Sequence, residues 1–253
     1  TLLIVFKMKE LRELAQKIQD KIMGLQNKAG RTGGGEAQRK VVNFRISFMH
    51  KVMSVIYHVD IVESIKKQAQ AIVEKKHNEG KLIIGQDMMR ESLALSHELE
   101  FKYTSMMEDI IYHTMSAIDN LPLLFVAFYR NVNEGTKFNS ARRALNNAHS
   151  VGLKITEVIN RNWYEWIEEL HKFRGEIYHY HSQICTGHME MNLGRDASGG
   201  QTMTERFVIK IPQNLRDSLR YPADKEIEIS EFCNDISKRA LNFFVEVLDT
   251  IDS

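Results

Sequence analysis

The chain has 253 residues, of which 43% are hydrophobic and 26% are charged, and its formal net charge is +1. This is an ordinary globular composition, long enough to bury a core, and it excludes an overall electrostatic field that attracts nucleic acid. Two cysteines exclude a disulfide scaffold and suit a reducing compartment, so a cytoplasmic location is expected. The longest apolar runs, such as LPLLFVAFY at 121–129, are too short to span a membrane, so no membrane partner is expected.

The amino-terminal third has the pattern of long helices. Residues 7–27 carry apolar side chains every three or four positions, which predicts an amphipathic helix. The glycines of 27–38 predict a loop, and because no Gly-Lys-Ser/Thr follows them, it is not a phosphate-binding P-loop. Residues 39–77 predict a second helix, with an interruption near 58–60, and 77–85 predict a connector.

Helical periodicity continues through the middle of the chain. Residues 87–119 predict a long helix that ends at DNLP, because Pro122 suits the first turn of a following helix. Two further helices are expected over 138–160 and 162–184.

The period changes near residue 188. Residues 188–193 and 204–212 predict two short strands, and GRDASGGQ between them predicts the tip of a hairpin. Ser230 can then cap a last amphipathic helix. The sequence therefore predicts an all-α helical bundle with a short β-hairpin insertion before the last helix.

Charge differs between the two ends of the chain. Residues 1–51 contain 11 Lys and Arg against 4 Asp and Glu, whereas residues 222–253 contain 3 against 8. The basic end can be a solvated surface, can pair with the acidic last helix, or can meet an anionic partner such as RNA.

The stretch ELHKFRGEIYHYHSQICTGH, residues 169–188, carries the most informative polar side chains. Arg174 falls inside an apolar stripe, so it must be paired, bound to a ligand or placed at an interface. At about 100° per residue, His181 lies on the same side as Arg174, and His179 lies roughly 140° away in a regular helix. Arginine binds phosphate oxygens and histidine transfers protons near neutral pH. Such a pair suits metal-independent RNA cleavage, in which the 2′-hydroxyl of the RNA attacks the neighbouring phosphate.

This order of features resembles the HEPN superfamily of helical-bundle domains. An aromatic helix, NRNWYEWIEELHKFRGEIYHYH, carries an Arg followed by His after four or six residues, and a hairpin and a closing helix come next. In that family an Arg-x(4–6)-His motif on the third core helix serves metal-independent ribonucleases. The resemblance implies Arg174, His179 and His181 as catalytic residues, with His179 favoured by the family pattern. It also implies an up-down core over 87–253, with 1–86 as an added helical part.

The resemblance further implies RNA as a ligand, a homodimer that builds a composite site, and a role in defence or stress response with an antitoxin or another protein partner. No cofactor and no metal are expected. Many active members carry Asn, Asp or His directly after the Arg, whereas this chain has Gly175. Gly175 favours the alternative of a non-catalytic helical module that binds a nucleotide or a protein partner.

Two other interpretations of the stretch stay open. Arg174 can be structural, paired with Glu176, Glu168 or the acidic last helix. Alternatively, a cluster of potential ligands can hold zinc, although no Cys-x-x-Cys or His-Glu-x-x-His completes it. The members of that cluster are His171, His179, His181, Cys185 and His188. The large aromatic residues of the region, Trp163, Trp166 and Phe173, are expected in the core or at a dimer surface rather than as a base-stacking platform.

Overall fold

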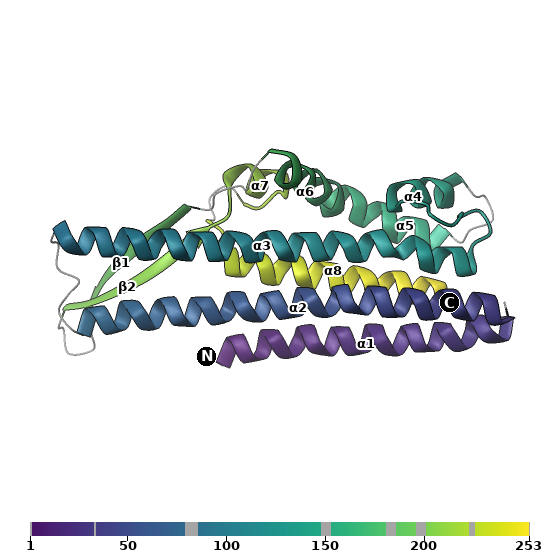
Figure 1. Cartoon of the computed structure of the whole chain (residues 1–253), viewed down its shortest axis with the longest axis horizontal. Helices are drawn as coiled ribbons and strands as arrows, with labels where there is room; N and C mark the ends of the chain where they lie inside the picture. The colour runs from purple at the N-terminus through teal and green to yellow at the C-terminus, as the bar shows by residue number, and fades with distance from the viewer. Residues whose placement is uncertain are drawn as a thin grey trace.

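The structure is a computed structural model that describes residues 2–32, 34–78, 86–147, 153–180, 186–195, 201–222 and 226–252. Within these ranges the backbone alone is described for 2–7, 73, 76–78, 86–97, 153, 176–180, 186–195, 201–207 and 252. The elements in chain order are α1 (Leu2–Thr32), α2 (Gly34–Asn78), α3 (Gln86–Phe128), α4 (Phe138–Asn147), α5 (Leu153–Asn162), the π-helical turn η1 (Trp163–Ile167), α6 (Glu168–Tyr180), β1 (Thr186–Arg195), β2 (Gln201–Lys210), α7 (Gln213–Ser218) and α8 (Ile229–Asp252) (Figure 1).

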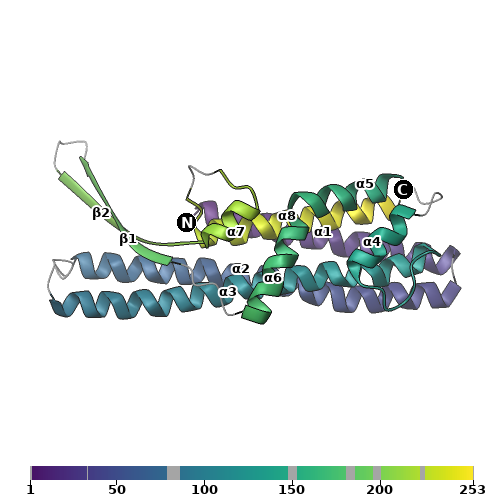
Figure 2. The same cartoon turned by 90° about the horizontal axis from the view of Figure 1, so that it is seen from above.

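The long helices α1, α2, α3 and α8 run side by side and form the body of the molecule (Figures 1 and 2). The short helices α4 and α5 lie at the end of the bundle where α1 turns into α2, and α6 crosses over α3 (Figure 2). Strands β1 and β2 pair antiparallel, from Thr186 opposite Lys210 to Arg195 opposite Gln201. The expected all-α bundle with a hairpin before the last helix is confirmed.

One continuous hydrophobic core joins these helices. Phe48 of α2 is fully buried, with its ring 4.7 Å from that of Phe44 and edge-on to Phe244 of α8 at 4.8 Å. Such aromatic contacts add to the free energy gained by burying the rings. Side chains of α1 and α2 share this core with those of α3 and α8, so packing continues across residue 86. The division into 1–86 and 87–253 stays a prediction about the family relationship.

The first two helices are longer than the sequence predicts. The loop expected over 27–38 is wrong, because α1 continues to Thr32 and α2 already begins at Gly34. Gly34 has a φ of +71°, a conformation that glycine adopts without steric cost, so a very short connection suffices. The interruption expected near 58–60 is also wrong, since α2 is continuous there and buries Val59 and Val62 on its core face.

Helix α3 does not end at DNLP. It continues through Pro122 to Phe128, which corrects the expected helix end. Proline within a helix removes one backbone hydrogen bond and costs about 3 kcal/mol. Ile118, Leu121 and Phe125 are all buried on the same side of α3, and their packing offsets that cost. The prediction was made from local propensity, which tertiary packing overrides here.

The region expected as two helices over 138–160 and 162–184 is more divided. The described part contains α4, α5 and α6, with η1 inserted between α5 and α6. Asn146 of α4 and Asn160 of α5 exchange side-chain hydrogen bonds of 2.9 and 3.2 Å, which hold these two short helices together.

The basic amino-terminal part pairs in part with the acidic last helix. Lys21 forms an ion pair with Asp249 of α8. A second ion pair between the same two helices has the opposite polarity, because Lys238 of α8 reaches Glu10 of α1 at 2.6 Å. Lys28 also donates to the Ile251 carbonyl oxygen at 3.1 Å. The internal pairing anticipated from the charge distribution is therefore present.

Among the described residues, the segment Glu98–Phe128 of α3 is long and apolar enough to cross a membrane by length and composition, with a mean hydropathy of 1.3. The most apolar part of this segment is 56% buried inside the protein. Contacts of α3 with α2, α6 and α8 bury this part of the segment, as in a core helix of a bundle.

Candidate functional site

Arg174 opens onto a pocket of about 760 Å³ between α3, the 129–137 loop, the first turn of α4 and the η1–α6 segment. Its apolar lining includes Met115, Val126, Phe138 and Trp163, and its polar lining includes Asp119, Asn133, Lys137, Asn139, His171 and Arg174. A pocket of this size, with an apolar wall and a few convergent polar groups, is typical of small-molecule sites.

The Arg174 guanidinium is fixed by Asp119. Nη1 of Arg174 donates to Oδ2 of Asp119 at 2.8 Å, and the Arg174 side chain is 21% exposed against 40% for Asp119. Of the three alternatives stated for Arg174, pairing is present, and its partner among the described residues is Asp119 of α3 rather than Glu168 or the last helix. The Glu176 side chain lies outside the described residues. A guanidinium has five N–H donors, and Asp119 is its one hydrogen-bonded partner among the described residues. Asp119 thus leaves the other donors available to further groups, a ligand among them.

His171 lies in the same pocket, one turn before Arg174. Three residues of helix separate the two by about 60° around the axis, so they share a face. His171 as a whole is exposed, but its ring is partly buried. This burial is the larger cause, and the nearby Arg174 charge the second, of a His171 pKa below the ordinary value of 6.5. A neutral imidazole beside a guanidinium can accept a proton at neutral pH.

Of the two histidines expected from the sequence, only the backbone of His179 is described. Helix α6 is regular through Tyr180, so the backbone at His179 lies roughly 140° from Arg174 around the helix axis. The His179 side chain and the whole of His181 lie outside the described residues. Their pairing with Arg174 stays a prediction. From the sequence, His171 was considered only as a metal ligand. Its spacing of three residues from Arg174 could have indicated that the two side chains share a helix face.

Arg142 supports the wall of the pocket from behind. It is 8% exposed, donates to the side-chain oxygens of Asn139 and Asn160, and lies over the Trp163 ring at 4.8 Å. No carboxylate among the described residues forms an ion pair with it. Trp163 begins the π-helical turn η1, a distortion that is frequent at functional sites.

The aromatic side chains of this region belong to the core, as expected. Trp163, Trp166 and Phe173 are 5%, 2% and 4% exposed. Stacking a base on Trp163 would require displacing Arg142 or Phe138, so Trp163 serves as a wall rather than as a stacking platform.

No group of three or more His, Cys, Asp or Glu suited to a metal ion occurs among the described residues. The side chains of four of the five residues considered for zinc, His179, His181, Cys185 and His188, lie outside the described part of the structure, so the zinc interpretation is neither supported nor removed.

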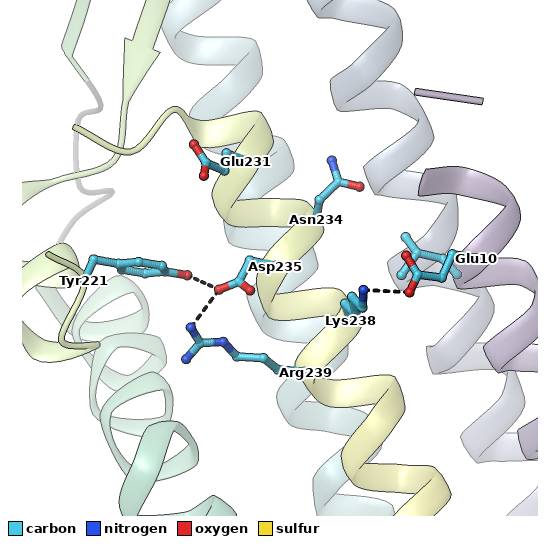
Figure 3. Close-up of a pocket in the computed structure, with 8 residues that line it drawn as sticks. Glu10, Tyr221, Glu231, Asn234, Asp235, Lys238 and Arg239 are labelled. Carbon is cyan, nitrogen blue, oxygen red and sulfur yellow. Dashed lines mark hydrogen bonds and ion pairs between the residues drawn. The ribbon is translucent and has the colours of Figure 1, made fainter. Parts of the chain in front are cut away.

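A second pocket, of about 350 Å³, lies between α1, α8 and the segment after α7 (Figure 3). Four of its five charged groups pair with one another. Oδ2 of Asp235 accepts hydrogen bonds from Tyr221 at 2.5 Å and from Arg239 at 2.9 Å, and Lys238 pairs with Glu10 (Figure 3). Because Glu10, Asp235, Lys238 and Arg239 are already engaged with one another, we interpret this pocket as a structural junction and the Arg174 pocket as the candidate site.

No protein-family model matches the chain, and searches of curated proteins and of solved structures find no significant match either.

Proposed function

We propose that this protein binds a nucleotide-like ligand in the Arg174 pocket, with a phosphate against the guanidinium. The observation that carries the proposal is the convergence of Arg174, Lys137 and His171 on one pocket that also has an apolar wall. Arginine recognises phosphate through its fixed fork of donors, and Asp119 already holds that fork in place. Preorganisation of this kind reduces the entropy lost on binding.

Binding can be tested by titrating nucleotides into the protein and following heat or tryptophan fluorescence, since Trp163 lines the pocket. Replacing Arg174 with Lys keeps the charge but removes the fork, so we expect affinity to fall by about tenfold or more. Arg161→Lys is the matched control, because Arg161 lies on α5 and pairs with Glu246 outside the pocket. Equal affinity of the wild type and Arg174→Lys would refute the proposal.

A second candidate function is metal-independent RNA cleavage by a HEPN-like protein in a defence or stress response. The neutral His171 beside Arg174 favours it, because this pair supplies a proton acceptor and a group that stabilises phosphoryl charge. Cleavage of single-stranded RNA should survive a strong chelator and should be lost in His171→Gln. If His179→Gln abolishes cleavage instead, the site is a composite one in a homodimer, which light scattering would detect.

A further inference from the structure

We infer that Asp119 is a specificity-determining residue that makes the Arg174 pocket favour singly charged oxyanions over doubly charged ones. The inference rests on the proposed function, because it concerns the anion that binds beside Arg174. It goes further by stating which charge state of that anion the pocket selects.

The charges that line the pocket cancel only in part and leave a weak positive excess. Arg174 and Lys137 contribute two positive charges, Asp119 contributes one negative charge, and His171 is neutral near pH 7, which leaves one net positive charge. Because Lys137 is exposed, solvent screens its interaction with a bound anion more than it screens that of Arg174.

An anion that binds Arg174 must lie beside the Asp119 carboxylate. Nη1 of Arg174 and Oδ2 of Asp119 are 2.8 Å apart, and Asp119 engages one guanidinium donor, so a ligand can bind the free donors while the carboxylate stays in place. The carboxylate then lowers the positive potential at the bound anion.

Two dependences on ligand charge decide which anion is preferred. The favourable interaction with a fixed potential grows in proportion to the charge of the ligand. The cost of removing an ion from water grows as the square of that charge. A pocket with weak positive potential therefore favours one charge over two, and removing Asp119 should help a doubly charged ligand twice as much, in free energy, as a singly charged one.

The test uses two ligands that share a base and a sugar: 3′,5′-cyclic AMP, with one negative charge, and 5′-AMP, with two at a pH well above its second pKa of about 6. Affinities are measured for the wild type, Asp119→Asn and Asp119→Ala, with Glu98→Gln as control. Glu98 lies on the same helix, is exposed and pairs with Lys102. The alanine variant keeps high helix propensity if the asparagine variant folds poorly.

We expect the wild type to prefer the cyclic nucleotide. Loss of Asp119 also frees the Arg174 side chain, which weakens the binding of both ligands alike, so the readout is the ratio of the two affinities. That ratio should shift towards 5′-AMP by about fivefold. Glu98→Gln should change neither affinity.

An unchanged ratio of the two affinities would overturn the role of Asp119 while Arg174-dependent binding remained. Failure of every variant to bind either nucleotide would overturn the proposed function and this inference together.

Discussion

The Arg174–Asp119 ion pair should contribute measurably to stability, because it joins α6 to α3 across a largely buried guanidinium. Two unit charges about 4 Å apart attract by about 1 kcal/mol in water and about 4 kcal/mol at an effective dielectric constant of about 20. Desolvation and side-chain entropy cancel much of this energy, and exposed pairs keep about 0.2–1 kcal/mol. With Arg174 21% and Asp119 40% exposed, we expect a coupling energy of about 1–1.5 kcal/mol.

A double-mutant cycle measures this coupling. The free energy of unfolding is obtained from urea titrations of the wild type, Arg174→Met, Asp119→Asn and the double variant. The Arg161–Glu246 pair is the matched control, since its side chains are 52% and 44% exposed and its coupling should stay below about 0.5 kcal/mol. A coupling no larger than that of the control would show that burial does not strengthen the Arg174 pair and would refute the reasoning.

Three further outcomes are expected. Arg220 has a φ of 58° at the end of α7, where the left-handed conformation favours glycine, so Arg220→Gly should raise the free energy of unfolding by about 1 kcal/mol, whereas Arg220→Ala should not. Burial, and then the neighbouring His58, lower the pKa of His113 from 6.5. The contribution of His113 to the free energy of unfolding is therefore complete above about pH 6.5, and it is lost as the pH falls towards the lowered pKa. Melting temperatures measured between about pH 7.5 and about pH 5 should fall less in His113→Gln than in the wild type, and an equal fall would contradict the assignment. Phe48→Ala should cost about 3–5 kcal/mol in urea titrations because Phe48 is fully buried, whereas Phe101→Ala should cost less than about 0.5 kcal/mol because Phe101 is 74% exposed.

The periodicity of side chains along the chain was enough to predict much of the architecture. The stripe of α1, the change of period near residue 188 and the last helix α8 all depend on interactions between residues a few positions apart, which the sequence displays directly. The same local reasoning failed at Pro122 and over 27–38, because long-range packing of α3 and of the α1–α2 pair outweighs the helix-breaking tendency of proline and glycine.

For the candidate site, the sequence by itself determined that Arg174 lies on an apolar helix face and needs a partner, since burying an isolated guanidinium is too costly. It could not determine which partner. Asp119 lies 55 positions earlier on another helix, and Lys137 comes from a loop between helices. Only the crossing of α6 over α3 brings them to one pocket, and that crossing depends on the packing of many core side chains at once rather than on any short stretch of sequence.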